Sequence, residues 1–135
     1  MDAYRPDTRQ LSLAVLLRHA ENQVRSSLQP ALEEAGLSLD HWRILSVLHG
    51  DPGLPMTSIA ERAVVPNATL TRHVDLLVER GLIVRRIDAA DKRRVVAALS
   101  PRGEDVVIPL QEAERAVEQA VISDLLRRAG LSPAL

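Results

Sequence analysis

The chain has 135 residues, of which 46% are hydrophobic, and its formal net charge at pH 7 is −1. This length and composition fit one compact domain and argue against a disordered chain. The sequence contains no cysteine, which excludes disulfides, thiolate metal ligands and cysteine redox sensing. No apolar run approaches the ~20 residues of a membrane span, and the N-terminus lacks the apolar stretch of a signal peptide, so we expect a cytoplasmic protein that contacts no membrane.

Positive charge is concentrated in the middle of the chain. Residues 67–94 contain seven basic and four acidic residues, whereas the rest of the chain contains ten basic and fourteen acidic residues. A positive centre between acidic ends is expected of a small regulator whose nucleic-acid-binding part is separate from its dimer-forming part. Chance clustering on a solvated surface is the alternative when charge is considered alone.

The first part of the chain is predicted to form a long helix. Apolar residues recur at spacings of three and four between Leu11 and about Leu28, at Leu13, Leu16, Leu17, Ala20 and Val24. Pro30 and Gly36 are expected to end or interrupt this helix.

Two shorter helices are predicted next. The first is expected to begin at about Ser38 or Asp40 as its cap and to run through His49, and a turn at residues 51–55 follows it. The second is expected to begin near Thr57 or Ser58 and to end near Ala63, and Ser58 and Glu61 have the spacing of a capping box.

The fourth predicted helix has an apolar and a polar face. It is expected to begin at Asn67, a good N-cap residue, and to end near Arg80, before Gly81. Its apolar stripe consists of Leu70, Val74, Leu77 and Val78. The opposite face presents Ala68, Thr69, Arg72 and Leu76, with His73 and Asp75 at its borders.

The residue pattern changes from helical to strand-like after this helix. Residues 82–87 and 94–99 are compatible with strands, and the segment between them is polar. These features predict a β-hairpin whose tip carries Lys92, Arg93 and Arg94.

The last predicted helix begins at Ser100, an N-cap residue followed by proline, and runs toward Arg128. Its apolar face consists of Val106, Leu110, Ala113, Val117, Val121 and Leu125. Pro109 is expected to kink this helix and Gly130 to end it. Residues 132–133 repeat the helix-start pattern, with only two residues after them.

This order of elements predicts a mainly α-helical fold with a small β-hairpin wing, a winged helix-turn-helix. One helix of such a motif fits the major groove of DNA, about 12 Å wide, and the preceding helix braces it. On the exposed face of the fourth helix, Arg72 can reach a guanine or a phosphate. The alternative is that Arg72 only pairs with Glu79 or Asp75. For Asn67 and Thr69 the alternatives are a helix cap and a solvated side chain.

The basic tip of the hairpin suits the minor groove, whose negative potential attracts guanidinium groups. We expect Asp91 to orient a neighbouring arginine by ion pairing rather than to contact DNA. The alternative is a solvated turn, because charged residues are common in turns.

Three stretches of the sequence resemble the MarR family of bacterial regulators. Residues 39–45 (LDHWRIL) look like the family's second helix, residues 59–62 and 69–82 are similar to its helix-turn-helix, and residues 91–103 are similar to its wing and the start of its dimer helix. The likeness spans about residues 11–126. Any one stretch alone is a weak signal, whereas their combined spacing is specific.

The resemblance implies a symmetric homodimer that binds a pseudo-palindromic operator in double-stranded DNA. It divides the chain into an N-terminal dimerisation helix (1–35), a DNA-binding lobe (36–100) and a C-terminal dimerisation helix (101–135). Arg93 would be the arginine of the family's Asp-x-Arg wing signature. The residues expected to contact DNA are Asn67, Ala68, Thr69, Thr71, Arg72, His73, Lys92, Arg93 and Arg94. Two features depart from the family: Val64 stands where glycine is common, and the chain ends where the family usually continues into a last helix.

Many relatives resemble repressors that a ligand releases from DNA, which implies a small aromatic or phenolic effector. By position, Arg18, His19, His41, Trp42 and Arg43 could line its pocket; equally, Trp42 could be a packing residue and the histidines ordinary surface groups. We expect no metal and no cofactor, since the four histidines are scattered. We expect no enzyme activity, because no glycine-rich phosphate loop, nucleophile elbow or paired-carboxylate setting is present.

Two functions from different classes follow. The first is a sequence-specific DNA-binding transcriptional regulator, a ligand-responsive repressor. The second is a winged-helix protein-interaction module that does not bind DNA. Arg72 together with Arg93 favours the first, because an interaction module has no need for arginines at both groove-reaching positions.

Overall fold

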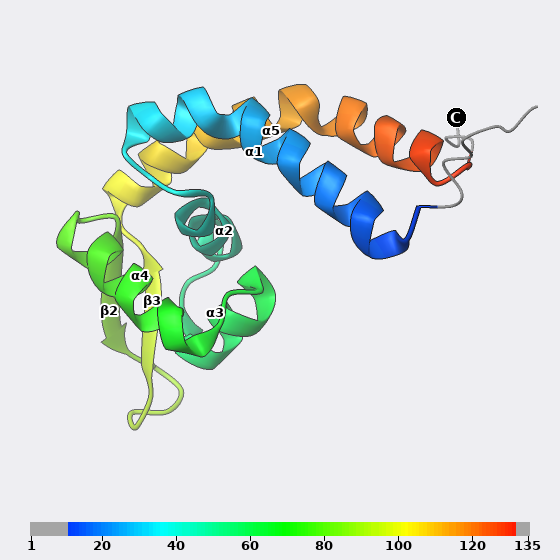
Figure 1. Ribbon diagram of the computed structural model, residues 1–135. Helices are drawn as coiled ribbons and strands as arrows, with labels where there is room; N and C mark the ends of the chain where they lie inside the picture. Colours follow the sequence, from blue (N-terminus) through cyan, green and yellow to red (C-terminus); the bar gives the residue numbers. More distant parts are fainter. Residues whose placement is uncertain (1–10, 132–135) are drawn as a thin grey trace, which may run out of the picture. The chain divides into compact units, whose positions relative to one another are not determined.

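The computed structural model describes residues 11–131, which contain five helices and one three-stranded antiparallel sheet (Figure 1). In chain order the elements are α1 (Leu13–Ala35), α2 (Leu39–Leu48), β1 (Leu54–Pro55), α3 (Met56–Ala63), α4 (Asn67–Glu79), β2 (Ile83–Ile87), β3 (Val95–Leu99) and α5 (Pro101–Arg128). The predicted mainly helical fold with a hairpin wing is confirmed. The helix start expected at residues 132–133 lies outside the described residues. None of the described helices combines the length and apolarity needed to span a bilayer.

Contacts divide the chain into two compact units. One unit takes the residues up to Gln29 together with those from Ala113 onward, and the other spans Pro30–Glu112. The second unit contains α2, α3, α4 and the sheet, which contact one another. Its fully buried apolar side chains include Ile44, Leu45, Leu48, Ile59, Leu70, Val74, Leu77, Ile83, Val107 and Leu110. This core holds the short helices against the sheet.

Helix α1 is longer than predicted, because Pro30 lies inside it rather than at its end. A proline removes one backbone hydrogen bond from a helix, but the buried side chains of Leu28 and Leu32 anchor α1 on both sides of Pro30. The helix ends before Gly36, which has a φ of +68°. Helix α5 likewise continues through Pro109.

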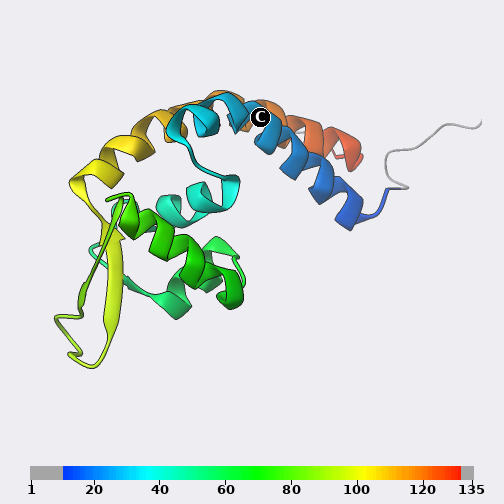
Figure 2. The ribbon, with the colours of Figure 1, turned by 60° about the vertical axis from the view of Figure 1, so that its left-hand side comes forward.

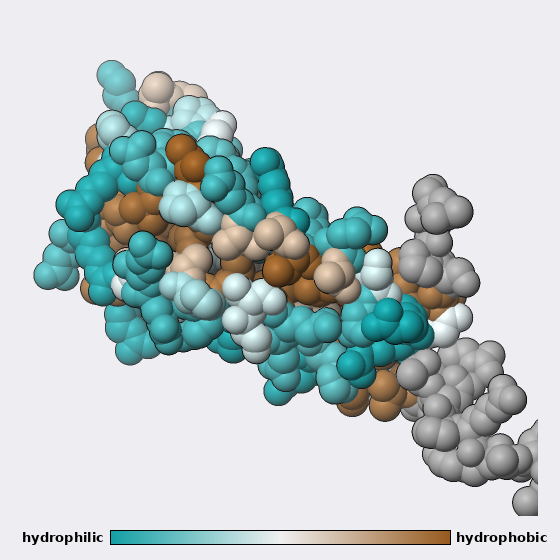
Figure 3. All heavy atoms as spheres, turned by 90° about the horizontal axis from the view of Figure 1, so that it is seen from above, coloured by the Kyte–Doolittle hydropathy of each residue, from teal (hydrophilic) through white to brown (hydrophobic). Residues whose placement is uncertain are grey.

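Helix α1 exposes much of its predicted apolar stripe. Leu16 is buried, whereas the side chains of Leu13 and Leu17 are 69% and 52% exposed. Figure 3 shows hydrophobic side chains among hydrophilic ones on the surface seen from above. The single chain therefore leaves apolar surface of this helix in contact with solvent.

The sheet contains the predicted hairpin, seen at the lower left of Figure 2, and one strand that was not predicted. Strands β2 and β3 pair antiparallel, with Ile83 opposite Leu99. On its other edge, β3 pairs with β1, with Leu54 opposite Ala97. The sequence analysis did not predict β1, because this strand has two residues, includes a proline and lies in a segment that reads as a turn.

Serine caps α2, whereas prolines precede α3 and α4. Ser38 caps α2 through its side chain. The capping box expected at Ser58 is not formed, because α3 already begins one residue after Pro55. Pro66 takes the N-cap position of α4, so Asn67 is the first helical residue and not the predicted N-cap. Proline suits a helix start, because its fixed φ is compatible with a helix and the N–H that it lacks would have no partner there.

Ser100 joins the end of α4 to the start of α5. Its backbone N–H donates to the carbonyl oxygen of Leu82 (3.0 Å), and its hydroxyl donates to that of Gly81 (2.5 Å). The same hydroxyl accepts a hydrogen bond from the N–H of Gly103 (2.9 Å), as expected of an N-cap. A Cβ at Gly103 would lie 2.1 Å from the carbonyl oxygen of Leu82, so this close approach requires glycine.

Val64 adopts a backbone conformation that favours glycine. It follows α3 with φ +56° and ψ +49°, and the N–H of Val65 bonds to the carbonyl oxygen of Ala60 (3.1 Å). Gly36 and Gly81 have similar positive φ values after α1 and α4. A side chain with a Cβ in this region costs about 1–2 kcal/mol. The Val64 side chain is 84% exposed, so packing does not offset this cost.

Val64→Gly is therefore expected to raise the free energy of unfolding by about 0.5–1 kcal/mol, because relief of strain exceeds the added entropy of the unfolded chain. Urea denaturation followed by circular dichroism measures the change. Val64→Ala keeps a Cβ and is the control, which should gain less. A glycine variant less stable than the alanine variant would contradict the assignment of strain to this residue.

Candidate nucleic-acid interface

Helix α4 is held by one face and leaves the other open to solvent. Its buried side chains are Leu70, Val74 and Leu77, three of the four predicted to form the apolar stripe. On the other side, Thr69 is partly exposed, and its hydroxyl donates to the carbonyl oxygen of Pro66 (3.1 Å). The exposed members of the set predicted to contact DNA on α4 are Asn67, Ala68, Thr71 and Arg72. The exposed face of α4 is thus made of small and polar side chains around one arginine.

Arg72 has no hydrogen bond or ion pair with another side chain within residues 11–131. The alternative in which it pairs with Asp75 or Glu79 is therefore not observed. Asp75 instead accepts a hydrogen bond from Arg85 of β2. All five N–H donors of the Arg72 guanidinium are available to an acceptor outside the chain.

Asp91 organises the tip of the wing. One of its carboxylate oxygens accepts hydrogen bonds from the backbone N–H (3.0 Å) and from the Nε (3.2 Å) of Arg93. The expected orientation of an arginine by Asp91 is therefore confirmed. These two hydrogen bonds hold the pKa of the Asp91 carboxyl below its ordinary value. The Arg93 side chain is 91% exposed, and the neighbouring Lys92 is exposed as well.

The base of the wing is fixed by two arginines that the sequence analysis did not single out. Arg85 pairs with Asp75 of α4, and Arg86 donates to the carbonyl oxygen of Pro52, in the turn before β1. These partners lie far apart in the sequence, so the strand register is needed to find them. The basic residues of the central cluster thus separate into those that hold the wing and those that face solvent.

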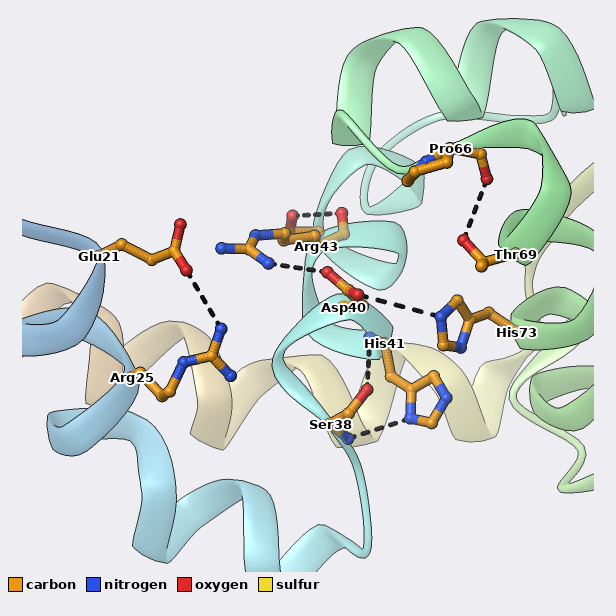
Figure 4. A network of polar contacts seen from close by, with 10 residues as sticks. Glu21, Arg25, Ser38, Asp40, His41, Arg43, Pro66, Thr69 and His73 are labelled. Atoms are coloured by element: carbon orange, nitrogen blue, oxygen red, sulfur yellow. Dashed lines mark hydrogen bonds and ion pairs between the residues drawn. The ribbon is translucent and has the colours of Figure 1, made fainter. Parts of the chain in front are cut away.

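His73 differs from the other predicted DNA-contacting residues, because its ring turns toward α2 (Figure 4). The ring centroids of His73 and His41 are 4.9 Å apart, and the ring planes meet at 84°. The Nε2 atom of His73 lies 3.9 Å from a carboxylate oxygen of Asp40. Only 22% of the His73 side chain is exposed. It lies at the border between the open and the packed face of α4.

The five residues predicted to line an effector pocket have different surroundings. His41 and Trp42 are buried, and Arg43 takes part in an ion pair. Arg18 and His19 are exposed on the part of α1 that belongs to the other unit. In that unit His19 helps to line a hollow of about 380 Å³. Within residues 11–131, no cluster of histidine, aspartate and glutamate is arranged to hold a metal ion.

Comparison with known proteins identifies relatives of this arrangement. The MarR family profile matches residues 35–94. The chain is 29% identical over 93 residues to the HTH-type transcriptional regulator FarR of Neisseria gonorrhoeae, a match that covers 69% of this chain and 64% of FarR. It is 23% identical over 121 residues to the homoprotocatechuate degradative operon repressor of Escherichia coli, which covers 87% of this chain and 82% of the repressor.

The fold is also found among solved structures. The crystal structure of NadR in complex with 4-hydroxyphenylacetate has a TM-score of 0.74 and 25% sequence identity to this chain, covering 93% of this chain and 86% of that chain. The family match at residues 35–94 includes α2, α3, α4 and the tip of the wing. The relatives are transcriptional regulators and not enzymes, in agreement with the sequence analysis. By sequence, by fold and by the elements that form its open surface, this chain is similar to transcriptional regulators of the MarR family.

Proposed function

We propose that this regulator is a repressor that binds a pseudo-palindromic operator in double-stranded DNA as a homodimer. Helix α4 would enter the major groove and the wing the minor groove. The observation that supports this most is that Arg72 on α4 and Arg93 at the wing tip both present guanidinium groups to solvent. The relatives named as a transcriptional regulator and a repressor support the same role. None of them supports the alternative, an interaction module without DNA binding.

The side chains of α4 suit close contact with base edges. Ala68, Thr69 and Thr71 are small, so the helix can approach the floor of the groove. Arg72 can donate two hydrogen bonds to the O6 and N7 atoms of a guanine. Asn67 lies in the first turn, where backbone N–H groups favour a phosphate. His73 would act on DNA through the position of α4 rather than by contact.

The wing tip suits the minor groove. Because Asp91 fixes the backbone N–H and the Nε of Arg93, less side-chain entropy is lost when its terminal amino groups contact DNA. Lys92 is exposed and can contact a phosphate. The Nε atom of Arg94 lies 4.0 Å from a carboxylate oxygen of Asp88. Arg94 would contact the sugar-phosphate backbone of the DNA beside the minor groove.

A homodimer would cover the apolar surface of α1. Leu13, Val15 and Leu17 are exposed in the single chain, as is Ile122 of α5. Exposed apolar side chains gathered on one helix favour burial against another surface. We infer that residues 1–35 and 101–135 form the dimer interface and that residues 36–100 form the DNA-binding lobe.

A small aromatic or phenolic acid is proposed as the effector that releases DNA. NadR binds 4-hydroxyphenylacetate, and the Escherichia coli relative is named for the degradation of homoprotocatechuate. Arg18 and His19 in one unit and Arg43 in the other each carry donors that suit a carboxylate. The other two residues of the proposed set, His41 and Trp42, are buried and would contribute to the pocket wall.

Arg72→Ala is expected to weaken operator binding by about 1–3 kcal/mol, because a contact with a base is lost. Arg93→Ala should weaken binding to all duplexes and reduce the slope of log K against log salt by about one. Fluorescence anisotropy at several salt concentrations measures both effects, with duplexes that the wild-type protein selects from a random-sequence pool. Arg62→Ala, at an exposed arginine of α3 outside the proposed DNA contacts and the proposed dimer interface, is the control. If the wild-type protein selects no duplex, or if both variants bind as it does, the interaction module becomes the better explanation.

The double substitution Leu13→Asp and Leu17→Asp is expected to convert the homodimer to a monomer, since two carboxylates would have to be buried in the interface. Sedimentation velocity measures the oligomeric state. Val64→Asp introduces one carboxylate at an exposed apolar residue outside α1 and should stay dimeric. A double variant that remains dimeric would show that the interface lies elsewhere.

Millimolar 4-hydroxyphenylacetate is expected to release the selected duplex, because a ligand that favours one conformation of the repressor shifts it away from the DNA-bound form. Competition in the anisotropy assay measures the release. Hexanoate carries the same charge without a ring and should have little effect. Equal effects of the two acids would contradict recognition of an aromatic ring.

A further inference from the structure

Helices α2 and α4 meet through two histidine rings. His41 of α2 and His73 of α4 lie edge to face, with ring centroids 4.9 Å apart (Figure 4). His41 is only 8% exposed. Its Nδ1 accepts a hydrogen bond from the backbone N–H of Ser38 (3.0 Å), and the Ser38 hydroxyl accepts one from the N–H of His41 (3.1 Å). One neutral ring therefore closes the N-terminus of α2 and supports α4.

A proton on His41 is incompatible with this arrangement. A protonated imidazole carries hydrogen on both ring nitrogens, so Nδ1 can no longer accept from the N–H of Ser38. The new charge would also be buried beside the ring of His73, where little water can solvate it. Protonation therefore weakens both the cap of α2 and its contact with α4.

Most of the surroundings of His41 favour its neutral form. Burial is the largest cause that lowers the pKa of His41 from its ordinary value of 6.5, followed by His73 and Arg80 of α4. Asp40 favours the charged ring, with a smaller effect. The Asp40 carboxylate is shared, since it lies 2.7 Å from Arg43 and 3.9 Å from His73. The neutral form of His41 is thus the one that the fold selects.

We propose that the contact between His41 and His73 is a proton-sensitive link that positions α4, so that acid weakens DNA binding. This inference rests on the proposed DNA-binding function. Because the unfolded chain takes up the His41 proton at a higher pH than the folded chain, the stability that depends on this contact is complete above about pH 6.5 and is lost as the pH falls below it. A loss of affinity in acid distinguishes this link from a general charge effect, since added positive charge on a protein ordinarily strengthens its binding to DNA.

The affinity for a duplex that the wild-type protein selects at pH 7.5 tests this link. Between pH 7.5 and 5.5, at constant ionic strength, wild-type affinity should fall by roughly threefold or more. His41→Gln removes the titrating ring but keeps an oxygen that can accept from the N–H of Ser38, as glutamine does in a capping box. Its affinity should therefore stay constant over this range. His49→Gln changes an exposed histidine just after α2 and should show the same loss as the wild type.

Urea unfolding over the same pH range separates this inference from the proposed function, because it requires no DNA. Wild-type stability should fall in acid more steeply than that of His41→Gln. Failure to select any duplex at pH 7.5 would count against DNA binding, and the unfolding data would still decide on the histidine link.

A wild-type affinity that is constant or rises in acid would overturn the proposal. A His41→Gln variant that loses affinity as the wild type does would overturn it as well. If this variant does not fold, an NMR titration of the histidine rings in the wild-type protein tests the link, because it measures the pH at which His41 takes up its proton. Protonation of His41 below pH 6.5 is expected, and protonation at or above that value would contradict the link.

Discussion

The hydroxyl group of Ser100 connects the parts of the molecule whose relative direction matters for fitting a groove. It donates to the carbonyl group that follows α4 and caps the first turn of α5, and its residue comes directly after β3. Because these hydrogen bonds are directional, they fix the direction in which the chain leaves α4 for the wing. The close approach of Gly103 to Leu82 leaves no room for a side chain between them. The angle between α4 and the wing is therefore set by a tightly bonded junction and not by a loop.

The acidic residues of the central segment explain why net charge is a poor guide to this surface. Asp75 and Asp91 each hold an arginine of the wing, one at its base and one at its tip. Their charges are thus neutralised locally, and they reduce the rotational freedom of the side chains that they bind. Among residues 11–131 Arg72 has no acidic partner of this kind, so its guanidinium stays exposed on the open face of α4. A total of −1 is compatible with a surface that presents positive charge on both of these elements.

Features with a local signal were predictable from the sequence. The hairpin, the cap at Ser100 and the role of Asp91 depend on residues a few positions apart. Strand β1 and the partner of Arg85 depend on strand register and on contacts between distant segments, which local patterns do not contain. The predicted N-caps of α3 and α4 were wrong. Serine and asparagine are common N-cap residues, but in this structure Pro55 and Pro66 take those positions. Helical spacing placed His73 at the edge of the open face, but only the packing of α2 against α4 shows where its ring points.

Pro55 ends β1 and at the same time takes the N-cap position of α3. No loop residue lies between the sheet and α3, the first helix of the helix-turn-helix. Arg86 also connects the wing to the turn at Pro52 through a hydrogen bond. A rotation of the wing therefore carries the N-terminus of α3 with it, because there are no loop residues to absorb the change. In a complex with DNA, this rigid piece would accommodate little of the misfit itself. The bending and the change in groove width needed for a close fit would fall on the duplex, and base sequences that deform easily would be favoured even where no side chain contacts them.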